Sequence, residues 1–227
     1  MLATPLLVGM LAARPVWAHL LLGAFWFVGY FAFFAAGLWL KAPPRRRPRV
    51  VRPMATYAVG SALLGGLTLA VAPGLIRWVP LFVVPMAIGL WSSWKRDERS
   101  LLSGIATTAG SCLMTLVAYD LGGGRDWERA WILAGVLAAY FVGTVLYVKT
   151  MIRERDEPAY HWLSMLFHAF AAVAMVPVSG ALVLVFAALA VRAGIMPAFR
   201  ASPKAVGIGE IAATVAVALT ALAVTGT

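Results

Sequence analysis

Nine apolar blocks, separated by short charged or proline-rich segments, make up most of this 227-residue sequence. They run at about 1–13, 16–40, 54–72, 74–94, 101–119, 130–148, 160–178, 180–197 and 206–225. Most have the roughly 20 residues that a helix needs to cross a bilayer. Lipid cannot satisfy backbone polar groups, so each block is predicted to be a helix. We expect an all-α, polytopic transmembrane bundle of eight to nine helices, in a single domain covering residues 1–227.

The composition excludes several classes of protein. Hydrophobic residues make up 62% of the chain, more than the half or so of a soluble domain. The net charge of +10 does not indicate nucleic-acid binding, because Lys and Arg are confined to short loops. The expected partner is the lipid bilayer. The single cysteine, Cys112, lies within an apolar block and is expected to pack as a small apolar residue.

Lys and Arg gather in alternate loops, which predicts the orientation of the chain. The four loops after even-numbered blocks hold 15 of the 19 cations, and the others are Arg14, Arg77, Arg125 and Arg129. The positive-inside rule therefore places these four loops and the N-terminus in the cytoplasm. The 15 cations are Lys41, Arg45, Arg46, Arg47, Arg49, Arg52, Lys95, Arg96, Arg99, Lys149, Arg153, Arg155, Arg192, Arg200 and Lys204.

Two features of this side carry further expectations. Residues 45–52, interrupted by Pro48, are expected to form an extended basic strip that contacts anionic lipid headgroups. Arg192 lies well before the end of the eighth block and is expected to snorkel toward the headgroups.

Two predicted cytoplasmic loops mix acids with bases: KRDERS at 95–100 and RERDE at 153–157. The positive-inside rule does not require acids, so two interpretations stay open: a mixed-charge cap over the helix ends, or a polar site. A site would hold an anionic headgroup through its cations, while acids shuttle protons or bind a metal of unknown identity. Its headgroup ligands would be Lys95, Arg96, Lys149, Arg153 and Arg155, and its acids Glu154, Asp156 and Glu157.

Three apolar blocks contain candidate groups of their own. His161 and His168 are about 10 Å apart along one helix face, too far for one metal ion. His168 lies deeper and is a catalytic candidate, or else a neutral histidine bonded to a neighbouring helix. Glu210 is interpreted as a helix-start carboxylate, or as a proton-coupling group together with His168. Small residues at 103–111 predict close helix packing at the centre of the bundle.

The segments LYVKTMIRERDE and WKRDERSLLSG, with the order of the helices, resemble the YwiC-like family over nearly the whole chain. This is a family of bacterial integral membrane proteins with no established biochemical activity. Its members tend to begin with a short His-Gly-Ala-Trp-Ala-Met segment, whereas this chain opens with MLATPLLVG. The first block is also too short to cross a bilayer, so the first helix is expected to be incomplete.

More distantly, the helix order is similar to UbiA-type prenyltransferases, which bind prenyl diphosphate through Mg²⁺ held by two Asp-rich motifs. Lys95 and Arg96 lie where that group has a Lys-Arg pair, and Glu154, Asp156 and Glu157 lie near its second motif. The first motif is missing, because GLWLKAPPRRR contains no Asp or Asn. The resemblance implies a Mg²⁺ cofactor only if that chemistry is retained.

These observations lead to a multi-pass membrane protein with a charged cytoplasmic pocket for an isoprenoid or other amphipathic lipid with an anionic head. The alternatives are a small proton-coupled transporter or accessory subunit without catalysis, and a prenyltransferase scaffold without chemistry. No enzyme class is assigned.

Overall fold

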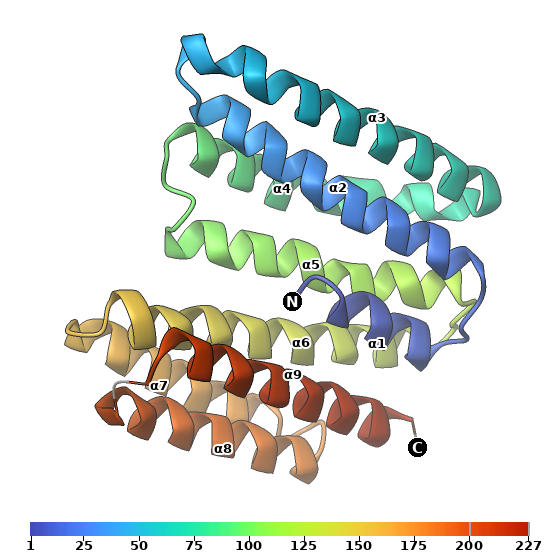
Figure 1. The fold of residues 1–227 in the computed structure, drawn as a ribbon. Helices are drawn as coiled ribbons and strands as arrows, with labels where there is room; N and C mark the ends of the chain where they lie inside the picture. Colours follow the sequence, from blue (N-terminus) through green and yellow to red (C-terminus); the bar gives the residue numbers. More distant parts are fainter. Residues whose placement is uncertain (200, 227) are drawn as a thin grey trace. The chain divides into compact units, whose positions relative to one another are not determined.

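The chain is all-helical in a computed structural model that describes residues 1–199 and 201–226. Arg200, one of the predicted cytoplasmic cations, lies outside the described residues. Within those residues there are nine α-helices and no strand (Figure 1). Their bounds are α1 Thr4–Ala12, α2 Ala18–Lys41, α3 Arg47–Val71, α4 Val79–Trp94, α5 Leu101–Leu121, α6 Trp127–Val148, α7 Pro158–Ala174, α8 Gly180–Ile195 and α9 Pro203–Thr225.

Seven helical segments of the described chain are long and apolar enough to cross a membrane. They are Ala18–Lys41, Pro44–Val71, Pro73–Trp94, Leu101–Leu121, Trp127–Arg153, Gly180–Phe199 and Pro203–Thr225. Helix α1 has 9 residues and is too short, as its apolar block predicted. Helix α7 has 17 residues, about 26 Å of helix, slightly less than the hydrocarbon core. The polytopic helical bundle expected from the sequence is confirmed.

The outer surfaces of these helices are apolar. Leu20, Phe170 and Leu184 each leave more than 70% of their surface outside the protein. In water such side chains would favour aggregation, whereas lipid tails solvate them. The described part of the chain therefore has the surface of an integral membrane protein.

The chain forms two compact units, which we describe separately. The N-terminal unit is Leu2–Trp127, and the C-terminal unit is Met1 with Glu128–Thr227. The expectation of a single domain stays a prediction.

In the N-terminal unit, α3 packs along α2, α2 against α4, and α4 against α5, which also receives the short α1 (Figure 1). Helix α5 is the most buried span of this unit, with 61% of its central window enclosed. Its small residues Ser103, Gly110 and Ser111 are buried, and a Cβ on Gly110 would meet the Pro85 ring at 3.4 Å. The prediction that small residues place this helix centrally is confirmed for the N-terminal unit. Cys112 is buried with a free thiol, as expected.

His19 ties the start of α2 to the end of α5. Its side chain is 3% exposed, and Nε2 lies 2.9 Å from the carbonyl oxygen of Ala118. Nδ1 is 3.0 Å from the amide nitrogen of Val16, which precedes α2. This buried histidine therefore fastens the N-terminal end of a spanning helix.

In the C-terminal unit, α7 packs against α8 and α8 against α9. Helix α6 is its most enclosed span, with 56% of its central window buried. Tyr140 and Thr144 of α6 reach Glu210 of α9 through hydrogen bonds, and Gly143 of α6 lies against His168 of α7. Polar groups thus connect α6 to the neighbouring helices of this unit.

The basic segment at 45–52 was expected to be extended, and this expectation was wrong. The segment is helical: Pro44–Arg46 forms a 3₁₀ turn, and α3 begins at Arg47. Pro48 lies in the first turn of α3, where a missing N–H leaves no hydrogen bond unmade. Proline at this position starts a helix instead of breaking it, so Arg49 and Arg52 belong to a helix.

Candidate functional site

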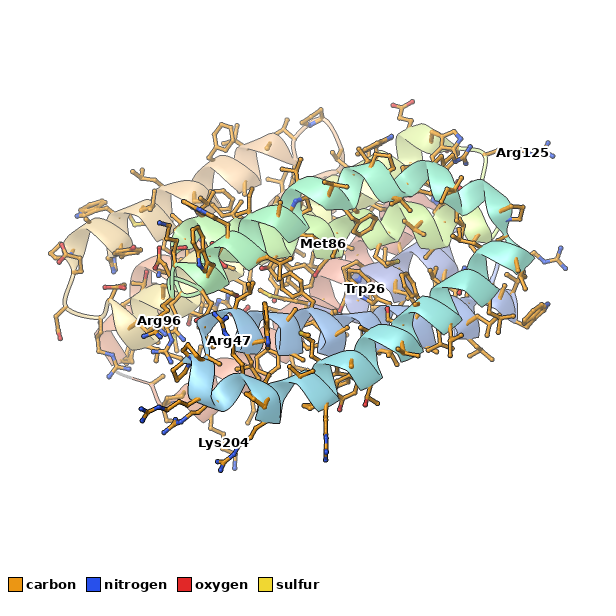
Figure 2. The ribbon with its side chains drawn as sticks, turned by 90° about the horizontal axis from the view of Figure 1, so that it is seen from above. Trp26, Arg47, Met86, Arg96, Arg125 and Lys204 are labelled. Carbon is orange, nitrogen blue, oxygen red and sulfur yellow. The ribbon has the colours of Figure 1, made fainter. Side chains whose placement is uncertain are left out.

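The basic loops of the N-terminal unit are held together at one end of it. Lys41, at the end of α2, forms an ion pair with Glu98 in the α4–α5 loop. Arg96 Nη2 donates to the carbonyl oxygen of Lys41 at 3.1 Å. Figure 2 shows Arg47 and Arg96 at this end of the unit and Arg125 at the other. The loops after α2 and α4 therefore form one basic end, made of Lys41, Arg45, Arg46, Arg47, Arg49, Arg52, Lys95, Arg96 and Arg99.

Most cations of this basic end are available for a ligand. Arg45, Arg46 and Arg49 are exposed, and so is Lys95, whose Nζ lies 4.9 Å from the centroid of the Trp94 ring. Arg47 is half-buried over the Trp39 ring. The acids Asp97 and Glu98 offset only part of this positive charge.

Arg96 occupies a backbone conformation that usually requires glycine. Helix α4 ends in a Schellman motif, in which Arg96 N–H donates to Ser93 and Asp97 N–H donates to Ser92. The residue at this position has positive φ, and Arg96 has a φ of 60°. A side chain in this region costs about 1 kcal/mol relative to glycine. Backbone strain of this kind is common at functional sites. Here it places a guanidinium beside the end of α2, where it donates to the Lys41 carbonyl oxygen.

Replacing Arg96 by glycine is expected to cost less stability than replacing its neighbour. Arg96→Gly relieves about 1 kcal/mol of left-handed strain but loses the exposed hydrogen bond to the Lys41 carbonyl oxygen, so the free energy of unfolding should change by less than about 1 kcal/mol, as measured by SDS titration. The matched control is Lys95→Gly, which removes a neighbouring cation at a right-handed position and should not stabilise. Equal destabilisation by both changes would show that Arg96 is not strained.

The charged turn of the C-terminal unit follows α6, where Lys149–Arg153 forms a π-helical turn. Lys149 is 9% exposed, with Nζ 3.9 Å from Glu154 Oε1 and 5.5 Å from the Tyr160 ring centroid. Arg155 caps the turn by donating to the carbonyl oxygens of Met151 and Ala201. Arg153 and Asp156 are exposed. Of the predicted site residues in this turn, Lys149 therefore pairs with Glu154, and Arg155 hydrogen-bonds to the backbone.

His168 is buried, with 3% of its surface exposed. Its Nδ1 is 2.7 Å from the carbonyl oxygen of Ser164, one turn earlier on α7, so Nδ1 carries the proton in this bond. The alternative interpretation expected a hydrogen bond to a neighbouring helix. The observed bond instead stays within α7. Its other edge lies against Gly143 of α6. His161 is half-buried beside the Trp162 ring.

Gly143 allows α6 to approach this histidine closely. A Cβ at Gly143 would lie 2.8 Å from His168 Nε2, so Gly143→Ala should displace the imidazole and cost about 1–3 kcal/mol of unfolding free energy. Gly135 lies on the same helix with nothing within 4 Å of its Cβ position. The control Gly135→Ala should therefore be neutral or stabilising by up to about 1 kcal/mol. SDS titration of both variants checks this, and equal effects would contradict the close contact.

A buried ion pair in the C-terminal unit was missed by sequence reasoning. Arg192 of α8 lies over the Tyr147 ring at 4.2 Å, and its Nη2 is 2.7 Å from Glu210 Oε1. The expectation that Arg192 snorkels was wrong, because a carboxylate on the next helix offers a closer partner. Glu210 is also not at the helix start: α9 begins at Pro203, about 10 Å earlier, beyond the reach of the helix dipole.

Two hydroxyl groups complete the surroundings of this carboxylate. Glu210 Oε2 accepts from Thr144 at 2.8 Å and from Tyr140 at 3.0 Å. Tyr140 also lies 3.0 Å from the hydroxyl of Thr214. We call Tyr140, Thr144, Tyr147, Arg192 and Glu210 the buried ion-pair cluster. A search for opposite charges within consecutive apolar blocks would have found Arg192 and Glu210.

The residues do not fit the Mg²⁺ site that the similarity to prenyltransferases implied. Among the described residues, no three His, Cys, Asp or Glu side chains are placed to hold a metal ion. Glu154 is instead paired with Lys149.

The fold and the apolar helix surfaces define an integral, multi-pass helical membrane protein. The chain matches the YwiC-like protein family over residues 1–119 and belongs to it. It is 28% identical to an "Uncharacterized protein" of Haemophilus influenzae, over 94% of this chain and 90% of the relative. It is 29% identical to "Uncharacterized protein YwiC" of Bacillus subtilis, over 74% and 70% of the two chains. No solved structure matches it significantly.

Proposed function

We propose that this YwiC-like protein binds an amphipathic lipid with an anionic headgroup, such as an isoprenoid phosphate, at the basic end of its N-terminal unit. The observation that carries the proposal is the tie between the α2–α3 and α4–α5 loops through Lys41, Glu98 and Arg96. It gathers exposed cations from two loops at one point where helices end. One guanidinium group can donate two parallel hydrogen bonds to the oxygens of a phosphate. A cluster of exposed arginines therefore suits a phosphate headgroup.

The position of the basic end supports a lipid rather than a free anion. Its cations follow the ends of spanning helices α2 and α4, the depth at which juxtamembrane Lys and Arg meet anionic headgroups. The same bias of Lys and Arg supports a cytoplasmic location for this end, in a bacterial inner membrane.

We assign roles to the predicted headgroup ligands by their contacts. Lys95 and Arg96 belong to the basic end and bind the headgroup. In the C-terminal unit, exposed Arg153 is the cation suited to contact lipid heads, whereas Lys149 and Arg155 hold the turn after α6. Glu154 and Asp156 lie in the same turn as these cations. We propose binding, and no reaction, as the activity.

Native mass spectrometry of the purified protein tests the proposal. The full chain is extracted in a mild detergent and offered an isoprenyl phosphate, phosphatidylglycerol, inorganic phosphate or phosphatidylcholine. We expect adducts with the two anionic lipids and not with phosphatidylcholine. Preference for the isoprenyl phosphate would identify the tail, whereas equal retention of phosphatidylcholine or retention of phosphate alone would overturn the proposal.

A further inference from the structure

The basic end presents its exposed cations in two groups, one on each loop. The α2–α3 group contains Arg45, Arg46 and Arg49, and the α4–α5 group contains Lys95 and Arg96. The nine cations of the basic end greatly outnumber the two acids of the same loops. A headgroup with one phosphodiester has one negative charge, so it would balance only a small part of this positive charge.

Two arginines, one from the start of α3 and one from the α4–α5 loop, are fixed at the end of α2. Arg96 Nη2 donates to the Lys41 carbonyl oxygen at 3.1 Å, and Arg47 Nε donates to that of Ala42 at 3.3 Å. These carbonyl groups belong to consecutive residues, so Arg96 Nη2 and Arg47 Nε lie within roughly 12 Å of each other. Figure 2 shows both arginines at this end of the unit. The two groups of cations are therefore held at a fixed separation.

Each loop also has a cation beside a tryptophan ring. The guanidinium of Arg47 lies 4.9 Å from the centroid of Trp39, and Lys95 Nζ lies 4.9 Å from that of Trp94. Tryptophan is enriched at the membrane–water interface, where its ring lies at the level of the headgroups. These contacts place both groups of cations at the depth of lipid phosphates and above the lipid tails.

We propose that the basic end binds one lipid that has two phosphates, a diphosphatidyl lipid such as cardiolipin. This inference rests on the proposed function and names the class of headgroup bound there. One phosphate contacts the α2–α3 group and the other contacts the α4–α5 group, with the glycerol that joins them over the end of α2. Arg47 and Arg96 keep donors for the phosphates, because a guanidinium has five N–H groups and one bond to a carbonyl oxygen leaves most of them.

The covalent link between the two phosphates favours one such lipid over two separate ones. When the first phosphate is bound, the link holds the second near the other group of cations at a high effective concentration. Two separate lipids would each lose translational freedom on binding. The fixed separation of the two groups adds to this preference, because little of the binding free energy is spent on ordering the loops.

Two lipids built from the same phosphatidyl group test the inference. The full chain in a mild detergent is titrated with tetraoleoyl cardiolipin or dioleoyl phosphatidylglycerol, and native mass spectrometry measures each affinity. Cardiolipin should bind at least about tenfold more tightly. Inorganic pyrophosphate, which has two phosphates and no tails, should not displace cardiolipin at equal concentration.

The outcomes separate this inference from the proposed function. Binding of both lipids with affinities within about twofold, as two unlinked phosphates would give, overturns the inference and leaves the proposed function intact. Displacement of cardiolipin by pyrophosphate also overturns it, because the ligand would then be a soluble anion. Binding of neither lipid overturns both.

Variants distinguish the headgroup of cardiolipin from its four tails, which are the same in every titration. Lys95→Gln with Arg96→Gln removes the α4–α5 group and should reduce the ratio of the two affinities to about two. The matched control, Arg14→Gln with Arg125→Gln, removes the same charge from the other end of the unit and should keep the ratio at about ten or more.

A second variant removes the other group of cations. Arg45→Gln, Arg46→Gln and Arg49→Gln together should also reduce the ratio to about two, although the remaining affinity for either lipid is lower. All three side chains are exposed, so the fold should be retained. A ratio that stays near ten after removal of either group would assign the preference to the tails and overturn the inference.

Discussion

Glu210→Gln is expected to lower the free energy of unfolding by about 3–5 kcal/mol, because it leaves the Arg192 guanidinium charged and without its carboxylate. The pair is largely enclosed, with side-chain exposures of 20% for Arg192 and 11% for Glu210. Water therefore cannot replace the missing partner. SDS titration of the purified variant, followed by circular dichroism, measures the effect.

A double variant separates the ion pair from simple packing. Arg192→Met with Glu210→Leu removes both charges and should recover most of the stability lost in Glu210→Gln. The control is Asp120→Asn, which breaks the pair with Arg77 in the N-terminal unit. Arg77 is 56% exposed, so that loss should be within about 1 kcal/mol. A double variant as unstable as Glu210→Gln would contradict this account.

Replacing Arg45, Arg46 and Arg49 together by glutamine is expected to weaken binding of an anionic lipid about a hundredfold. Each cation near a lipid headgroup contributes roughly 1 kcal/mol, so three removals amount to about 3 kcal/mol. All three side chains are exposed, and stability should change little. Native mass spectrometry at graded lipid concentrations measures the change in affinity.

The matched control removes exposed cations from the other end of the N-terminal unit. Arg14 precedes α2 and Arg125 follows α5, so their replacement by glutamine changes charge without touching the basic end. Lipid affinity should stay within about twofold, since screening limits effects beyond about 10 Å. A similar loss in both variants would show that net charge, and not the basic end, binds the lipid.

The helices could be predicted from the sequence because apolar length alone determines what can cross a bilayer. The predicted block 101–119 became α5 Leu101–Leu121, within two residues at each end. The start of α3 was missed, because charged residues and Pro48 suggested an extended segment. Proline is well tolerated in the first turn of a helix but breaks or kinks the middle of one. Composition alone does not show which position Pro48 occupies.

The candidate site was predictable only in part. The loops after α2 and α4 follow from hydrophobicity, but the contact of Lys41 with Glu98 depends on how α2 and α4 pack. Arg192 and Glu210 were assigned to separate roles because each was judged within its own block. Their pairing requires the antiparallel packing of α8 and α9, which brings together residues on either side of a turn. Such pairs are a property of helix packing, not of local sequence.

Accessibility labelling of single cysteines tests the central claim most directly, namely that the cations gather on one side of the membrane. Cys112 is first replaced by Ala, and cysteine is then introduced at Arg96, Arg153 or Arg125. In right-side-out cells, an impermeant maleimide should label only the Arg125 position, and lysis should expose the other two. Labelling of the Arg96 and Arg153 positions from opposite sides would contradict the account.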